Sequence, residues 1–320
     1  MEKLTSWLLK EPVGVMPVLD KWILFFFKVI YLGIRFSVKI ALGRKRRDRI
    51  YVGLGIHFND SFGPSFYIVS FLYKTIKFLR LGNPVSLKIN VPKYGYKVLC
   101  PIKKEEIVNM TIREDDIIEH FTPKQGDIVV DIGANIGRYT LIASKRVGTN
   151  GKVVAIEAHP GNFEMLNRNI KLNRLTNVIP LNYAAYSKET KVKLYVPDEE
   201  SGYTIYHTLM ERTGKKFVEV DAITLDYLLL QLNGIREGEV VGVNWIKIDV
   251  EGVEFEVLKG ATNVLSKSKD IALLIEVHGP DNYRPIMEFL NSYNFIVEFE
   301  KAYETGDKHI VLRKYDSGKL

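Results

Sequence analysis

The residues whose side chains could most clearly take part in binding or catalysis stand at the ends of short apolar runs. Such runs are typical of buried strands. The residues are Asp131, Glu157, Asn182, Asp249 and His278. In a mainly parallel sheet, ligands bind in a crevice beyond the carboxyl ends of the strands. We therefore expect these side chains to gather at one edge of a sheet, where carboxylates accept hydrogen bonds and an imidazole accepts or releases a proton.

The sequence DIGANIGRYT begins with Asp131 and places Gly133, Asn135 and Gly137 between an apolar run and a helix-like segment. A dinucleotide-binding turn needs another glycine where Asn135 stands, because the backbone must approach the pyrophosphate closely. The acid at the strand end would repel phosphate but could pair with an ammonium group. The turn therefore indicates a cationic ligand without phosphate, such as S-adenosylmethionine, although a purely structural turn would have the same residues.

An acid follows the second apolar run at a distance that suits a ribose. Glu157 lies 20 residues after Gly137, where the two oxygens of a carboxylate can accept hydrogen bonds from both ribose hydroxyls. The third run ends near Asn182, beside the expected position of an adenine. The alternative for Glu157 is a solvated acid at the end of a strand.

Alternating strands and helices are needed to hold these residues in place. The pattern predicts a helix over residues 136–147, a strand over 153–156 and an amphipathic helix that buries Phe163, Leu166 and Ile170. The alternation continues to about residue 279. It predicts an α/β protein with a mainly parallel sheet and helices on both faces.

Four motifs in this order resemble one known family. They are DIGANIGRYTLIAS, the acid after the second strand, ITLDYLL and IKIDVEGVEFEVLKGA. Over roughly residues 125 to 300 they resemble the FkbM-type family of S-adenosylmethionine-dependent methyltransferases. The resemblance implies a Rossmann-like class I methyltransferase fold, S-adenosylmethionine as cofactor, and methyl transfer to hydroxyl groups of sugars, polyketides or other small molecules. The sequence departs from the family pattern at EAHP and at Arg138.

The fourth strand is followed by acids where a methyl acceptor would lie. Asp249 and Glu251, with Glu254 one turn into the next helix, stand where amino-methyltransferases of nucleic acids have an Asn/Asp-Pro-Pro-aromatic turn. A positioned base contributes a factor of roughly 10² to 10⁴ to proton removal from an alcohol. We therefore expect Asp249, Glu251 and His278 to be catalytic, with Asp249 as the first choice of base. The alternative for His278 is a hydrogen-bonded loop residue.

The same strand ends could bring Asp249, Glu276 and His278 close enough to hold a divalent ion, since oxygen and imidazole ligands suit several such ions. The spacing of the 6 histidines shows no ligand pattern. Cys100 is the single cysteine, which excludes an intramolecular disulfide and a cysteine-rich zinc site. No metal site is therefore predicted from the sequence.

The net charge of +7 is concentrated at the N-terminus. Residues 1–80 contain 14 Lys and Arg against 5 Asp and Glu, a net charge of +9, whereas the remaining residues contain 31 against 33, a net charge of −2. Nucleic-acid binding requires a basic track on the binding surface. The nearly neutral catalytic part therefore gives no expectation of a nucleic-acid partner.

The basic extension contains an amphipathic segment at residues 21–47. Lys21, Lys28, Arg35 and Lys39 share one helical stripe, opposite an aromatic and aliphatic face, and a basic cluster follows at residues 44–47. A helix of this kind can lie in a membrane interface and attract anionic lipid. Packing of the same face on the domain, or on a second subunit, would give the same pattern.

The sequence therefore divides into a basic, apolar helical extension at 1–81, a β-hairpin and helix lead-in at 82–124, and a methyltransferase domain at 125–320. Residues 197–217 form either a substrate-facing loop or a plain surface loop. The late apolar segment lacks a clear cleavage site, so we expect a cytoplasmic protein, with peripheral contact at the inner face of the membrane as one alternative. A glycan, a lipid or another small molecule would supply the acceptor hydroxyl. Two other functions stay open: an NAD(P)-dependent Rossmann oxidoreductase and a non-catalytic membrane-associated binding module.

Overall fold

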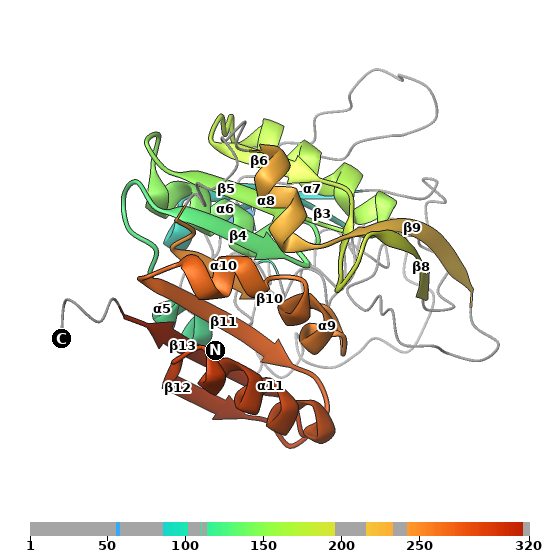
Figure 1. The fold of residues 1–320 in the computed structure, drawn as a ribbon. Coiled ribbons are helices and arrows are strands. Elements are labelled where there is room, and N and C mark those ends of the chain that lie inside the picture. The colour runs from blue at the N-terminus through green and yellow to red at the C-terminus, as the bar shows by residue number, and fades with distance from the viewer. Residues whose placement is uncertain are drawn as a thin grey trace, which may run out of the picture.

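A seven-stranded sheet forms the centre of the computed structural model, which describes residues 56–57, 86–101, 110, 114–195, 216–232 and 242–315 (Figure 1). In spatial order its strands are β12 (Ile296–Ala302), β13 (Lys308–Lys314), β11 (Ile271–Val277), β10 (Trp245–Ile248), β4 (Ile128–Ile132), β5 (Lys152–Ile156) and β6 (Val178–Leu181).

The sheet is mainly parallel, as the sequence predicts. Strands β11, β10, β4, β5 and β6 pair in parallel, whereas β13 runs antiparallel to both of its neighbours. The chain leaves β4 toward β5 and β6, and then returns to place β10 on the other side of β4. This reversal of strand order between β4 and β10 is the place where α/β sheets bind their ligands.

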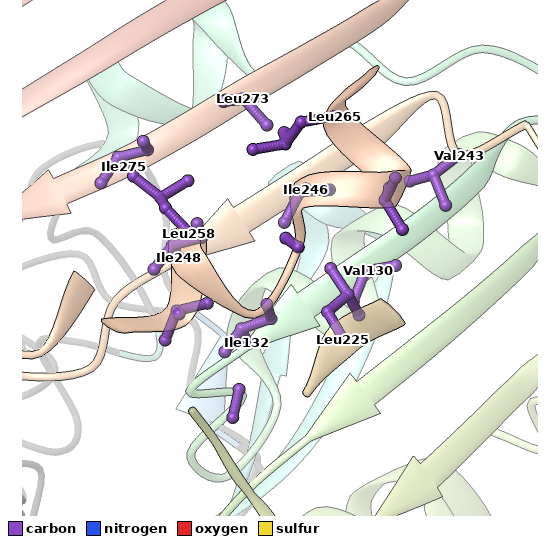
Figure 2. Packing of buried hydrophobic residues seen from close by; sticks show 14 of the residues in the cluster. Val130, Ile132, Leu225, Val243, Ile246, Ile248, Leu258, Leu265, Leu273 and Ile275 are labelled. Carbon is purple, nitrogen blue, oxygen red and sulfur yellow. The ribbon is translucent and has the colours of Figure 1, made fainter. Parts of the chain in front are cut away.

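Helices cover both faces of the sheet because the strand residues alternate between two apolar clusters. Val129 and Trp245 pack with α5, α6 and the hairpin β2–β3, whereas Val130, Ile246 and Leu273 pack with α8 to α11 (Figure 2). The helices are α5 (Asp115–His120), α6 (Arg138–Val147), α7 (Pro160–Leu172), α8 (Leu225–Leu232), α9 (Glu254–Lys259), α10 (Thr262–Lys267) and α11 (Pro280–Ser292). Figure 1 shows α10 and α11 on the same side of the sheet.

The predicted lead-in elements are present. Strands β2 (Ser86–Val91) and β3 (Tyr96–Pro101) pair as an antiparallel hairpin around a single 3₁₀ turn, η1 (Pro92–Tyr94), and α5 follows. Strand β1 (Ile56–His57) pairs in parallel with β2. A separate small sheet contains β7 (Ala184–Ala185), β9 (Phe217–Ile223) and β8 (Thr190–Tyr195).

Two sequence-based expectations lie outside the described residues. They are the amphipathic segment at 21–47 and nearly all of the loop at 197–217. Within the parts of the chain that the structure describes, no helix has both the length and the apolar character needed to cross a membrane.

Candidate active site

A cavity opens at the reversal point, beyond the ends of β4, β5 and β10. Its empty volume is about 590 Å³, including the part open to solvent. Its walls come from three strand ends, α7 and the small sheet. The lining residues are Ile132, Gly133, Asn135, Ile156, Glu157, Ala158, Asn162, Tyr183, Ala184, Ala185, Leu194, Asp249, Val250, Glu251 and Val253.

The turn between β4 and α6 needs its glycines for space as well as for conformation. Gly133 has φ 73°, and a Cβ there would lie 1.8 Å from the backbone oxygen of Asp249. Gly137 has φ 106°, and its Cβ would lie 2.7 Å from Leu166 Cδ1. Asn135 also adopts a positive φ, 52°, a region that asparagine tolerates better than most residues. The turn therefore follows closely along the end of β10.

Glu157 joins the end of β5 to this turn. Its Oε2 accepts the backbone N–H of Asn135 at 2.7 Å and its Oε1 accepts the N–H of His159 at 2.8 Å. Burial, opposed in part by these two hydrogen bonds, raises the pKa of Glu157 to about 7. Each carboxylate oxygen can accept a second hydrogen bond, and the residue lines the cavity. The ribose contact of Glu157 stays a prediction, and this position supports it.

Asp131 lies under the cavity instead of on its wall. The side chain is fully buried, accepts a hydrogen bond from Thr140 Oγ1 at 2.5 Å and lies 4.0 Å from Lys247 Nζ. The direct contact that the sequence suggested between Asp131 and a cationic ligand has no support in this geometry. The pairing of Lys247 with Asp131 across β10 and β4 explains the difference, because that long-range register supplies a cation from within the protein.

Asn182 follows the end of β6, as expected, but it does not line the cavity, and its contact with an adenine stays a prediction. Its Nδ2 donates to the backbone oxygens of Glu157 at 2.7 Å and Ala158 at 3.0 Å, which ties the ends of β5 and β6 together. Tyr183 and Asn162 line the cavity there instead. Sequence reasoning missed both residues. Tyr183 is adjacent to the residue that was chosen, and Asn162 lies in the first turn of α7, where an N-terminal position on the amphipathic helix was the one available signal.

Lys247 connects the two acids at the ends of β4 and β10. Its Nζ lies 3.0 Å from Asp249 Oδ2 and 3.4 Å from the backbone oxygen of Gly133. Although burial lowers the pKa of Lys247, the charges of Asp249 and Asp131 raise it above its ordinary value. Burial acts in the opposite direction on Asp249, but the charges of Lys247 and His278 hold its pKa below the ordinary value. Both groups are therefore charged.

Beyond Asp249, the structure brings three further carboxylates around one imidazole. His278 Nδ1 lies 2.8 Å from Glu254 Oε1, and His278 Nε2 lies 3.5 Å from Glu251 Oε2 and 3.8 Å from Glu276 Oε1. Burial, together with the charge of Asp249, raises the pKa of Glu251 to about 8. Burial lowers the pKa of His278, but the hydrogen bond to Glu254 and the charges of Asp249 and Glu251 raise it to about 10. Two of the three residues chosen as catalytic, Asp249 and Glu251, thus line the cavity, and His278 lies beside them.

The cavity suits a ligand that donates hydrogen bonds. Asn135 lines it, and the buried Oδ1 of this residue has no hydrogen-bond partner among the described residues. A hydroxyl or ammonium group of a ligand would satisfy that oxygen. In the turn, the backbone N–H groups of Gly133 and Ala134 donate to the oxygen of Ile156, and that of Asn135 donates to Glu157, so these groups are already used within the protein.

A sheet with this strand order and a single reversed strand is the Rossmann-like fold of class I methyltransferases, whose cofactor is S-adenosylmethionine. The chain belongs to the FkbM family of these enzymes, because the model of the methyltransferase FkbM domain matches residues 131–297. The resemblance seen in the sequence is thereby confirmed.

Individual relatives share moderate similarity. The hexuronic acid methyltransferase AglP of Haloferax volcanii is 28% identical over 205 residues, covering 63% of this chain and 78% of the relative. The methyltransferase sdnD of Sordaria araneosa is 29% identical over 188 residues, covering 51% of this chain and 70% of the relative. The crystal structure of methyltransferase FkbM from Methylobacillus flagellatus has 17% identity and a TM-score of 0.42, covering 60% of this chain and 44% of that one.

Proposed function

We propose that this methyltransferase acts on oxygen, transferring a methyl group to a hydroxyl of a sugar, a glycan, a lipid or another small molecule. The observation that carries this proposal is the pair of cavity-lining carboxylates, Asp249 and Glu251, with the imidazole of His278 beside them. When bound, S-adenosylmethionine supplies an electrophilic methyl group. Glu157 and the turn at Gly133 and Asn135 would hold its nucleoside and amino-acid parts.

An acceptor hydroxyl must lose its proton as its oxygen takes the methyl group, so the acceptor end needs a base. Glu251 is better placed for that role than Asp249, which was the first choice from the sequence. Both residues line the cavity, but Asp249 Oδ2 is held by Lys247 at 3.0 Å. Glu251 also lines the cavity, and burial together with the charge of Asp249 raises its pKa to about 8, close to the value at which a base works near neutral pH.

The relative from Haloferax volcanii supports a sugar acceptor, because its name describes methylation of a hexuronic acid. Sugars also present several hydroxyls in fixed geometry, and alignment of acceptor and donor contributes about 7 kcal/mol or more in favourable cases. Uronic acids and neutral sugars are therefore the first acceptors to test.

The test uses the full chain, S-adenosylmethionine with a labelled methyl group, and a panel of uronic acids, neutral glycans, lipids and simple alcohols. We expect label in a product that survives mild alkali, because a methyl ether survives where a methyl ester of a uronic acid is hydrolysed. In the Glu251→Gln variant, the rate should fall roughly 10²-fold or more, with an unchanged affinity for S-adenosylhomocysteine. Glu288→Gln, an exposed position on α11, is the matched control. Label found only on nitrogen or in alkali-labile product would contradict the proposal.

A further inference from the structure

We propose that Asp249, Glu276 and His278 form a binding site for a divalent cation of the Mn²⁺ type at the acceptor end of the cavity. Each residue offers one ligand atom, and these three atoms all lie within 4.8 Å of one another. Asp249 follows β10, while Glu276 and His278 stand two residues apart at the end of β11, a spacing that puts two side chains on the same face of a strand. The parallel register of β10 and β11, with Ile248 opposite Ile275, brings the two strand ends together.

The imidazole is oriented as a metal ligand would be. Glu254 is fully buried, and its Oε1 lies 2.8 Å from His278 Nδ1 and accepts the backbone N–H of Gly252 at 2.8 Å. With Nδ1 held by Glu254, the other ring nitrogen, Nε2, faces Asp249 and Glu276. A carboxylate that holds one ring nitrogen while the other faces outward is the usual arrangement around a metal-binding histidine.

The distances within the cluster also favour a shared central ion. His278 Nε2 lies 4.0 Å from Asp249 Oδ1 and 3.8 Å from Glu276 Oε1. Both separations are too long for an N–H···O hydrogen bond, which spans about 2.7 to 3.2 Å. Atoms that each lie roughly 2.0 to 2.2 Å from one metal ion are separated by up to about 4.4 Å. The ligand atoms therefore surround a point instead of pairing with one another.

Most of the charged groups around that point are carboxylates. Asp249, Glu251, Glu254 and Glu276 all approach His278. Lys247 contacts Asp249 through its other oxygen, Oδ2, so Asp249 Oδ1 still faces the cluster. Partly buried carboxylates are costly unless they are paired or coordinate a metal, and a divalent cation would offset two of these charges.

Ligand type indicates which ion fits. Carboxylates suit Mg²⁺, Ca²⁺ and Mn²⁺, whereas imidazole suits Zn²⁺, Fe²⁺ and related ions. Mn²⁺ accepts both kinds of ligand. Three protein ligands would leave further coordination positions for water or for an acceptor hydroxyl, because Asp249 lines the cavity. The use of the ion in catalysis rests on the proposed function, since an alcohol bound to a divalent cation loses its proton more easily.

A second group of ligand atoms shares Glu276 and lies behind the first. It consists of Glu114, Glu276 and His309. The side chain of His309 is only 4% exposed, and Tyr139 donates a hydrogen bond to Glu114 Oε2 at 2.9 Å. No residue of this second group lines the cavity, and one of its oxygens is already bonded. The first group, which includes the cavity-lining Asp249, is therefore the better metal site.

Binding of Mn²⁺ itself provides the test. The full chain is stripped with a chelator and titrated with Mn²⁺, and free Mn²⁺ is followed by electron paramagnetic resonance. We expect one tightly bound ion per chain, with affinity lowered at least tenfold in Asp249→Asn and in Glu276→Gln. Glu114→Gln, from the second group, and the exposed Glu288→Gln should bind as the wild type does. Pulsed spectra of the bound ion should show coupling to an imidazole nitrogen that is lost in His278→Gln.

Folding of each variant is checked by circular dichroism and by binding of S-adenosylhomocysteine. Absence of saturable Mn²⁺ binding, or wild-type affinity in a folded Asp249→Asn variant, would overturn the site. Loss of binding in Glu114→Gln alone would assign the ion to the second group instead. If methyl transfer continues in excess chelator, the proposed function does not depend on the metal. If Mn²⁺ binds but no acceptor is methylated, the metal site is supported and the proposed function is not.

Discussion

Lys247 and Asp249 form an ion pair at the end of β10, with 3.0 Å between Nζ and Oδ2. The lysine side chain is 6% exposed and also lies 4.0 Å from the fully buried Asp131. One buried cation therefore lies close to two carboxylates, one from each of two adjacent strands. Through its contacts with Asp131 and the backbone oxygen of Gly133, Lys247 thus fixes the end of β10 against the end of β4, where the cavity opens.

Replacing that cation should destabilise the fold strongly. Lys247→Met keeps most of the side-chain volume but leaves two carboxylates without their partner, and breaking a buried pair in this way costs about 3 to 5 kcal/mol. Urea unfolding of the variant measures the loss. Lys191→Met, which breaks an exposed pair with Asp221, should leave the unfolding midpoint unchanged. Similar midpoints for the two variants would show that Lys247 does not hold the strands.

Removal of the Glu157 carboxylate should weaken cofactor binding. Glu157→Ala deletes a charged acceptor for the ribose hydroxyls, and hydrogen bonds to charged groups contribute roughly 1.5 to 3 kcal/mol. We expect the Kd for S-adenosylhomocysteine, measured by calorimetry, to rise at least tenfold. Glu164→Ala on the exposed side of α7 serves as the control. An unchanged Kd in a folded Glu157 variant would remove this residue from the cofactor site.

The same carboxylate should make stability depend on pH. Burial raises the pKa of Glu157 from an ordinary value of 4.5 to about 7, and the charges that act on it most are those of Lys247 and Asp131. Between these two pKa values the folded state holds a proton that the unfolded state has lost. The free energy of unfolding therefore falls as the pH rises through this window, by up to about 3 kcal/mol.

Urea titrations without cofactor between pH 4.5 and 7.5 test this sign. The free energy of unfolding of the wild type, minus that of Glu157→Gln, should decrease with rising pH, because glutamine does not titrate. A difference that stays constant, or that increases with pH, would mean that Glu157 keeps an ordinary or lowered pKa.

The N-terminal segment gives a prediction that rests on the sequence alone. Deletion of residues 1–47 should abolish sedimentation with anionic vesicles, and salt should weaken binding of the intact chain, because surface charges are screened over about 8 to 10 Å at physiological ionic strength. Binding of S-adenosylhomocysteine should survive the deletion. If the intact chain does not bind vesicles and the truncated chain no longer binds the cofactor, the segment is part of the fold or of a dimer interface.

Several residues of the cavity could be predicted from the sequence because they belong to local sequence patterns. Strand ends and the glycine turn are short-range features, so Gly133, Glu157 and Asp249 were placed on the cavity without a structure. The positions of Asp131 and Asn182 depend on which strands are neighbours. Lys247 faces Asp131 only because β10 pairs with β4, and that pairing joins residues more than a hundred positions apart.

Long-range contacts also hid the other residues of the site. Leu194 reaches the cavity from β8, and Tyr183 directly precedes β7, so both depend on where the small sheet packs. The role of Glu254 in holding His278 depends on α9 and β11 coming together. Sequence spacing carries no information about such a contact until the fold is known.

The hairpin at residues 86–101 lies outside the matched family domain, yet its backbone is bonded to α7. Asn169, fully buried, accepts the N–H of Leu99 at 2.6 Å and donates to the oxygens of Leu99 at 3.0 Å and Ile136 at 2.8 Å. A chain that began at residue 131 would leave this amide half unsatisfied and uncover Val98 and Cys100 of the core. A minimal version of this enzyme is therefore longer than the matched family domain and must begin no later than residue 86.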